Sequence, residues 1–312
     1  MSERLGEIRL IPRTEISETK WNALLATSDN AIFMSLWYLD AVMENWQAFV
    51  LGDYELVFPI SISKKMTFNY SLQPLFLRAF SVLGTDKKNE TSFLKYIFSK
   101  LDFYQLTLTN EYLELAEKLD CKSKSTVFQV VELNEEYNQV SKKYSENTKR
   151  KLKDFKKSNA VFTEVKDVRV LIELFRKEKG EQFQHLTDET YSRLEQIMLN
   201  ALENNAGFIE AISLENEIVA IGFFIRLKSQ LLYLKGIVTE KGKKIGAMQA
   251  LFDKVIQVHT CTSESLDFGG SSDSGLASFN KKFGASDRNY LILKQNNVKW
   301  PLNKLVDRKL GM

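Results

Sequence analysis

Histidine, cysteine, proline and glycine are all scarce in this chain. Its 312 residues include two histidines, two cysteines, four prolines and 14 glycines. Because the two histidines stand in no ligand-spaced cluster, a zinc site has almost nothing to be built from, and we expect no metal. Cys121 and Cys261 lie far apart in sequence, which argues against a disulfide framework. A hydrophobic content of 44% with little glycine and proline argues against disorder.

Long hydrophobic runs and a strong net charge are missing too. No apolar stretch approaches the roughly 20 residues that cross a bilayer, and the first seven residues are charged without the apolar segment of a signal peptide. We therefore expect a soluble, cytoplasmic protein with no membrane span. The net charge of +3 is too small to indicate nucleic-acid binding by itself.

The chain is long enough for two domains, since domains of about 150 residues are common. Hydrophobic periodicity predicts the same order in both halves: strand, two helices, three meandering strands, helix, strand, helix, strand. The first half has predicted strands at residues 8–11, 48–51, 55–63, 75–83, 103–108 and 126–133. The second half has predicted strands at residues 161–165, 208–213, 218–227, 231–237, 265–268 and 290–293. We predict an α+β fold with an α/β mixed sheet, as two tandem domains at 1–136 and 137–312.

One helix start and one connecting helix are indicated by local sequence. Thr187 precedes two acidic residues and then an apolar helical pattern, which is typical of an N-cap with a favourable first turn. A polar helix at residues 135–158 is predicted to connect the two halves.

The connector carries a concentrated positive charge. Between residues 142 and 157, eight basic residues stand against only Glu146 and Asp154: Lys142, Lys143, Lys149, Arg150, Lys151, Lys153, Lys156 and Lys157. Clustered phosphate contacts supply sequence-independent affinity, so this run can hold tRNA or a nucleotide-linked precursor. A solvated helix face that packs through Leu152 and Phe155 is the commoner explanation and stays open.

A basic, glycine-containing turn follows the strand at residues 231–237. Backbone amides and lysines at a helix start attract anions, above all phosphates. The candidate cofactor-binding residues are Lys241, Gly242, Lys243, Lys244, Ile245 and Gly246. An exposed basic loop before a surface helix explains the same residues.

Three residues are candidates for catalysis. Asp267 ends a predicted buried strand, where open α/β sheets place ligands, and it can receive a proton from an attacking amine; it can equally cap the glycine backbone that follows. Tyr233 and Lys235 alternate along one strand, so we expect them on the same side, where either can donate to an oxyanion or protonate a leaving group. Purely structural roles for both stay open. No covalent nucleophile stands out.

Three short segments are similar to the motifs of a known family. Residues 145–153 (SENTKRKLK) resemble S-x-N-x-R-R-x-I-K, residues 266–271 (LDFGGS) resemble Y-D-F-G-G-S, and residues 279–285 (FNKKFGA) resemble F-K-x-x-F-G-A. With the repeated element order, they resemble the FemABX-like double acyltransferases of bacteria, which pair two domains of the acyl-CoA N-acyltransferase (GNAT) fold. The motifs lie in the connector and the second half, and the first half matches by element order alone.

One position departs from the GNAT pattern. The pyrophosphate turn R/Q-x-x-G-x-G/A aligns with residues 241–246 (KGKKIG), and Lys244 stands where the first glycine is expected. A side chain there crowds the backbone approach to a pyrophosphate. FemABX relatives that take aminoacyl groups from tRNA do not need that glycine pattern.

The resemblance implies an acyltransferase whose second domain binds the donor. The donor is an acyl-CoA such as acetyl-CoA, or a related activated group, and the acceptor is a small-molecule or peptide amine. The first domain shapes the acceptor site, with Trp37, Tyr70 and Arg78 as candidate substrate-binding residues. Two alternatives stay open: an aminoacyl-tRNA-dependent transferase acting on a cell-wall precursor, and a non-catalytic binding module with a decayed donor site.

Overall fold

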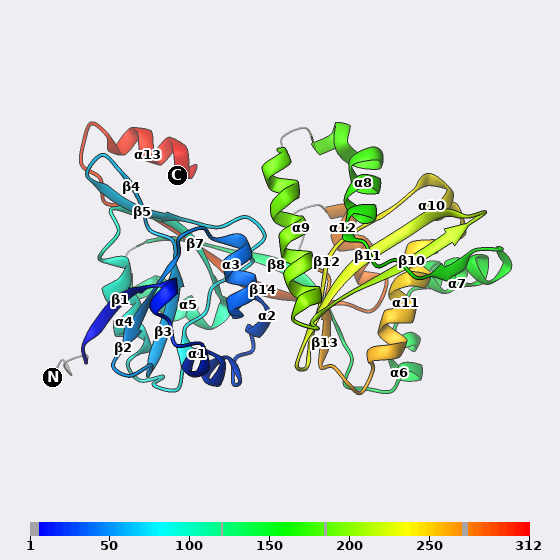
Figure 1. The fold of residues 1–312 in the computed structure, drawn as a ribbon, viewed down its shortest axis with the longest axis horizontal. Coiled ribbons are helices and arrows are strands. Elements are labelled where there is room, and N and C mark those ends of the chain that lie inside the picture. The colour runs from blue at the N-terminus through cyan, green and yellow to red at the C-terminus, as the bar shows by residue number, and fades with distance from the viewer. Residues whose placement is uncertain (1–5, 120, 184–185, 270–273) are drawn as a thin grey trace. The chain divides into compact units, whose positions relative to one another are not determined.

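The computed structural model describes residues 6–119, 121–183, 186–269 and 274–312 (Figure 1). The chain forms two compact units. Unit 1 comprises residues 1–126 and 289–312, and unit 2 comprises residues 127–288. This division differs from the expected domains at 1–136 and 137–312 in two ways. Unit 2 begins at residue 127, and the end of the chain, residues 289–312, belongs to unit 1. Strand β14 (Ser286–Asn296) pairs with β7 (Phe103–Thr109), with Tyr290 opposite Thr109 and Asn296 opposite Phe103.

Unit 1 contains two groups of strands. The first, in the order β1-β2-β3-β6, consists of β1 (Ile8–Pro12), β2 (Gln47–Leu51), β3 (Leu56–Ile60) and β6 (Leu83–Gly84), all antiparallel. The second, in the order β4-β5-β7-β14, adds β4 (Ser63–Lys65) and β5 (Phe68–Leu72). The helices are α1 (Glu18–Leu25), α2 (Ala31–Met34), α3 (Leu36–Val42), α4 (Glu90–Phe98), α5 (Leu113–Lys118) and α13 (Asn303–Leu310), with 3-10 turns at Arg13–Glu15 and Asn110–Tyr112.

Local signals explain the start of unit 1. The Ser17 side chain caps α1 by accepting from the Lys20 amide. Trp21 is fully buried on the inner face of α1, where its indole donates to the Met34 carbonyl at 2.9 Å and packs edge-on against Trp46. The helix is therefore anchored by one aromatic side chain.

Two strand predictions in unit 1 were wrong. The predicted strand at 55–63 is divided between β3 and β4, and the predicted strand at 75–83 is reduced to the two residues of β6. Phe76 adopts a φ of 68°, which an extended strand does not accommodate. The strand that follows β4 and pairs with it in an antiparallel hairpin is β5.

The strands of unit 2 follow the order β8-β13-β12-β11-β10-β9. They are β8 (Lys122–Glu132), β13 (Ser265–Asp267), β12 (Gln230–Val238), β11 (Glu217–Leu227), β10 (Gly207–Leu214) and β9 (Val161–Thr163); β12 and β13 run parallel, and the other neighbours are antiparallel. The helices are α6 (Tyr137–Lys142), α7 (Glu146–Lys157), α8 (Val168–Lys179), α9 (Asp188–Glu203), α10 (Glu240–Ile245), α11 (Ala247–His259) and α12 (Ser274–Lys281), with a 3-10 turn at Gly180–Phe183. The element order predicted for this half is confirmed, with two differences: α10 stands where a turn was expected, and the last predicted strand, β14, pairs in unit 1.

The unit 2 sheet has a helix layer on each face. Helices α8 and α9 cover one face, through contacts with β10, β11 and β12. The opposite face packs against α11, and α7 packs on α11 in turn (Figure 1). The main core of unit 2 lies on this second face and includes Phe224, Leu231, Phe252 and Phe283.

The connector is two helices rather than the single helix predicted. Helix α6 ends at Lys142, and α7 begins after Ser145, whose hydroxyl accepts from the Thr148 amide at 3.2 Å. The Ser145 amide donates to the carbonyl of Lys282, so the break is fixed by the segment after α12. Throughout the described ranges, the helices are too short or too polar to cross a membrane.

Candidate functional site

Strands β12 and β13 separate in the middle of the unit 2 sheet. They pair only between Gln230–Leu232 and Ser265–Asp267, although β12 continues to Val238. Beyond Leu232, no other described strand pairs with this edge of β12. An edge that opens next to the carboxyl end of a parallel strand is where α/β sheets bind ligands.

A β-bulge lies at this opening. Lys235 pairs with Phe223 and Tyr233 pairs with Phe224, so Leu234 has no partner in the β11–β12 ladder. The extra residue of a bulge leaves the regular hydrogen-bond pattern and re-aims the neighbouring side chains. Backbone donors released in this way can point at a carbonyl oxygen placed beside the strand.

The bulge overturns the expectation that Tyr233 and Lys235 face the same side. Their partners Phe224 and Phe223 are neighbours on β11 and point to opposite faces, and laterally paired residues share a face. Tyr233 therefore faces α11, and Lys235 faces α8. The period of two that the sequence suggested is interrupted by one unpaired residue.

Tyr233 is part of the core on the α11 face. Its ring lies 5.3 Å from that of Phe224 and 4.8 Å from that of Phe252, and burial raises the pKa of its phenol. The side chain therefore stays protonated and contributes mainly to packing.

Lys235 is the titratable group at the opening. Its ammonium lies 3.9 Å from the centre of the Phe175 ring of α8, and burial lowers its pKa to about 8. An amine with a pKa this close to neutrality can both donate and accept a proton at physiological pH. Lys235 therefore stays a candidate for proton transfer at the opening.

Asp267 shares the α8 face with Lys235. Asp267 pairs with Leu232, and Leu232 pairs with Ile225. Ile225 is two residues from Phe223, the partner of Lys235, so all of these residues share one face of the sheet. The Asp267 carboxylate accepts from the Gly269 amide at 2.8 Å, the capping arrangement that the sequence left open. Gly269 has a φ of 83°, and a Cβ there would lie 2.6 Å from the Tyr233 carbonyl oxygen, so only glycine fits. Residues 270–273 of the same motif lie outside the described residues.

The predicted anion-binding turn is a helix. Residues Glu240–Ile245 form α10, and the side chain of Thr239 caps it by accepting from the buried Gly242 amide at 3.1 Å. Two of the three exposed lysines are engaged by neighbouring carboxylates: Lys241 meets Glu217 at 2.7 Å, and Lys243 pairs with Glu240, whereas the Lys244 side chain is exposed.

The end of α10 is closed by α7. The Lys244 carbonyl accepts from the Lys151 ammonium at 2.8 Å, and Ile245 packs against the core of the α11 face. Gly246 is left-handed, with a φ of 77°, and a Cβ there would lie 2.6 Å from the Lys151 carbonyl oxygen. Protein backbone therefore occupies the space facing Gly246 at the start of α11.

The candidates of unit 1 fall in two separate clusters. Trp37 packs edge-on against Tyr38, and the Arg78 guanidinium lies 4.9 Å from the ring of Phe33, which itself packs on Tyr38. Tyr70 lies elsewhere, stacked on Phe103 at 4.7 Å with the Lys309 ammonium 5.0 Å from its ring. The structure thus brings Trp37 and Arg78 together and leaves Tyr70 apart.

Asn280 departs from the family motif that residues 279–285 resemble. It occupies the lysine position of the F-K-x-x-F-G-A motif, is buried, and donates to the Gln129 side chain at 3.3 Å. No positive charge is therefore supplied at this position. The described part of the chain contains no group of three His, Cys, Asp or Glu side chains that could hold a metal ion.

Comparison with known proteins identifies the fold. No protein-family model and no curated protein sequence matches the chain. The structure is similar to that of FemX, with a TM-score of 0.69 and 12% identity over 98% of this chain and 100% of that one. It is also similar to L-PGS from Bacillus licheniformis (TM-score 0.57, 16% identity, 99% and 100% covered) and to a tandem GNAT protein from the clavulanic acid biosynthesis pathway (0.56, 9%, 94% and 99%). The chain therefore has a tandem GNAT fold, similar to the fold of FemX.

Proposed function

We propose that this protein is an aminoacyltransferase, which moves an aminoacyl group from the terminal ester of aminoacyl-tRNA to an amine of a cell-wall precursor. The observation that carries the proposal is the bulge at Leu234, with Lys235 beside it at the opening between β12 and β13. This arrangement offers backbone donors and one titratable cation to an acyl group lying along β12. The shared fold of FemX and L-PGS supports a transferase of this kind.

The surroundings of α10 favour an ester donor over a CoA thioester. A CoA pyrophosphate needs free amides and close backbone approach at the start of a helix. Here the Gly242 amide is used by Thr239, and the Lys151 backbone faces Gly246. The terminal ester of tRNA makes no such demand, since its phosphates lie along the nucleic-acid chain.

The chemistry follows from the groups at the opening. The acceptor amine attacks the ester carbonyl carbon, forming a C–N bond and a tetrahedral oxyanion. The oxyanion is stabilised by the Lys235 ammonium and by backbone donors at the bulge. As the ester C–O bond breaks, the leaving ribose oxygen takes a proton from Lys235, and the amine proton passes to solvent or returns to the Lys235 amine.

The test is transfer of a radiolabelled amino acid from charged tRNA to a peptide precursor with a free side-chain amine. The amide product resists hydroxylamine, whereas the ester donor does not. We expect Lys235→Met to lower kcat about 100-fold, the scale of a proton-transfer and oxyanion contribution, and Lys235→Arg to keep the charge but lose proton transfer. The matched control is Lys177→Met, which removes an exposed lysine from the same covering helix, α8.

An acyl-CoA donor is the competing assignment. Binding to the native state raises the free energy of unfolding by about 2.7 kcal/mol at a ligand concentration of 100 times Kd. A rise in melting temperature with acetyl-CoA, together with acetyl transfer to the same amine, would show that the donor is a CoA thioester and not a tRNA ester. If neither donor supports transfer, the protein is a non-catalytic binding module.

A further inference from the structure

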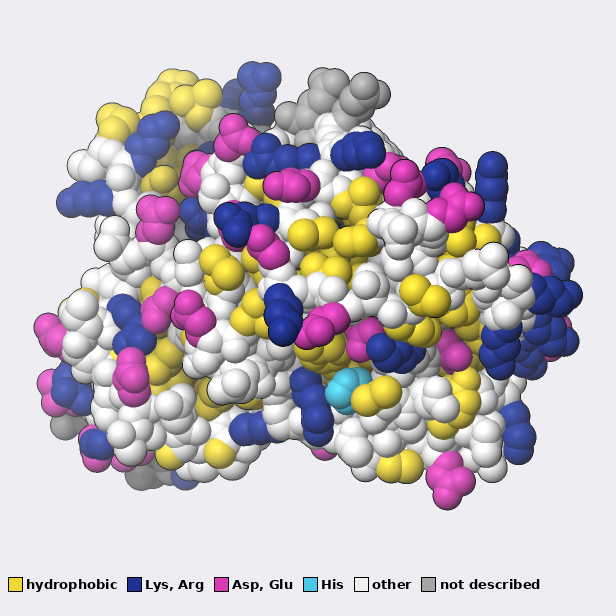
Figure 2. Space-filling model, turned by 45° about the vertical axis from the view of Figure 1, so that its right-hand side comes forward, with side chains coloured by type: hydrophobic (Ala, Val, Ile, Leu, Met, Phe, Trp, Pro, Cys, Tyr) yellow, Lys and Arg dark blue, Asp and Glu magenta, His cyan; other side chains and the backbone are white. Residues whose placement is uncertain are grey.

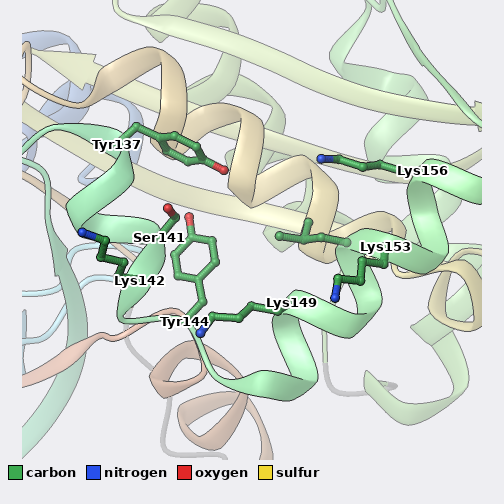
Figure 3. Close-up of a pocket in the computed structure, with 8 residues that line it drawn as sticks. Tyr137, Ser141, Lys142, Tyr144, Lys149, Lys153 and Lys156 are labelled. Atoms are coloured by element: carbon green, nitrogen blue, oxygen red, sulfur yellow. The ribbon is translucent and has the colours of Figure 1, made fainter.

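A pocket of about 360 Å³ lies between α6 and α7, on the α11 side of unit 2. Its volume falls within the 300–1,000 Å³ range of small-molecule sites. It lies apart from the residues assigned to acyl transfer and is lined by Tyr137, Ser141, Lys142, Tyr144, Lys149, Leu152, Lys153 and Lys156 (Figure 3).

A buried tyrosine hydroxyl stands in the wall of this pocket, beside the carboxylate of Asp253. Tyr144 is 3% exposed, and within the described ranges its phenol oxygen has no hydrogen-bond partner of ordinary geometry. Figure 3 shows the ring rising from the segment between α6 and α7 into the space among the lining residues. Burial raises the pKa of this phenol, as do the charge of Asp253 and a polar contact with it, so the hydroxyl is a donor at physiological pH. An acceptor atom of a ligand would give this donor a better-placed partner than Asp253.

The lysines of the pocket are poorly neutralised. Lys153 and Lys156 are exposed, and neither has a hydrogen-bond or ion-pair partner among the residues that the structure describes. Lys142 meets only the neutral side chain of Gln139, at 3.4 Å. Lys149 alone meets a carboxylate, that of Glu146, at 2.9 Å on the solvent side.

One carboxylate lies behind the pocket. Asp253 of α11 accepts from the Tyr137 hydroxyl at 2.8 Å, and burial raises its pKa. Four lysines therefore outnumber Asp253 and Glu146, and positive potential dominates. Figure 2 shows Lys and Arg side chains gathered at one edge of the molecule, the end of unit 2 where Figure 1 places α7.

We propose that the pocket between α6 and α7 binds the terminal phosphate or pyrophosphate of a small phosphorylated molecule. The lysine ammoniums neutralise the ionised oxygens, and the Tyr144 hydroxyl donates to one of them.

The shape of the site favours a terminal phosphate over a nucleic-acid chain. A chain binds along an open groove, with successive phosphates and stacked bases in contact with the surface. The donor of this pocket is instead a single buried phenol between α6 and α7, which offers a hydrogen bond to one phosphate group and no surface on which bases stack. The lysines alone would not distinguish the two ligands, whereas Tyr144 does.

The experiment is isothermal titration calorimetry of the full chain with inorganic pyrophosphate and with ADP. A third titration uses a single-stranded RNA of about ten nucleotides without terminal phosphates, long enough for one groove-type site. The variants are Lys153→Met with Lys156→Met, and Tyr144→Phe. The matched control is Arg150→Met, which removes one exposed charge from α7 about 100° round the helix from Lys149.

We expect pyrophosphate to bind the wild-type protein and the double lysine variant to weaken binding tenfold or more. Tyr144→Phe should weaken it about three- to tenfold with the same salt dependence, because the charge is unchanged. Arg150→Met should change it less than twofold. Equal losses in Arg150→Met and the lysine variant, wild-type affinity in Tyr144→Phe, or binding of the RNA alone would each overturn the proposal.

This outcome is independent of the proposed function, because it is read from binding rather than transfer. Melting temperatures without ligand show whether each variant folds, and Tyr144→Phe keeps the buried ring, so it should fold as the wild type does.

Discussion

Replacing Gly246 by alanine tests whether α7 closes the start of α11. The residue is buried and left-handed, with a φ of 77°, and an added Cβ would lie 2.6 Å from the Lys151 carbonyl oxygen. A left-handed conformation costs an L-residue about 1–2 kcal/mol, and forcing a methyl group into a packed site costs about 1–3 kcal/mol. Because both costs apply, we expect Gly246→Ala to lower the free energy of unfolding by about 2–5 kcal/mol.

Urea denaturation measures this change, and hydrogen exchange shows where it acts. The protection of amides in α7 and α11 should fall more than that of unit 1. The control is Gly180→Ala, at the end of α8. There φ is −53°, and no atom lies within 4 Å of the added Cβ. Alanine fits at Gly180 and should stabilise the protein by about 0.4–1 kcal/mol.

One result would refute the reasoning. If Gly246→Ala changes stability by less than about 0.5 kcal/mol, the usual range of an unimportant surface substitution, the Lys151 backbone does not fill this space. The start of α11 would then be open to an anion, and a CoA pyrophosphate would regain a plausible binding site.

Three further predictions concern side chains of unit 2. Because burial lowers the pKa of Lys235 from 10.5 to about 8, the unfolded state binds more protons between these values. The stability of the wild type relative to Lys235→Met should therefore rise by up to about 3 kcal/mol between pH 8 and 10.5, measured by urea denaturation across this range; a flat difference would contradict the burial of the ammonium. Tyr137→Phe removes the 2.8 Å hydrogen bond to Asp253 and should cost about 1 kcal/mol in the same assay, and an unchanged urea midpoint would show that solvent replaces this bond. Lys241→Met breaks only the exposed pair with Glu217, so the urea midpoint should not move; a clear loss would mean that the pair supports α10.

Much of unit 2 could be predicted because the signals are local. The capping of α9 by Thr187, which accepts from the Thr190 amide, is confirmed. The order of strands and helices followed from apolar periodicity alone, and the structural comparisons support the tandem fold. The connector was predicted less well. Ser145 is a favourable N-cap residue, but the charged helical pattern on both sides of it suggested one continuous helix instead of α6 and α7.

The sequence by itself determined most helices and strands of unit 2, because caps, turns and periodicity act within a few residues; it misplaced two strands of unit 1 and missed the break between α6 and α7. Only the tertiary structure decided which face each side chain occupies at the site. The bulge at Leu234 depends on the register of β11 against β12, and it moves Lys235 away from Tyr233 to the opposite face. The closure of Gly246 by Lys151 joins residues about 95 positions apart, and the pairing of β14 with β7 returns the end of the chain to unit 1. Such pairings are fixed by packing across the whole sheet, which no short stretch of sequence encodes.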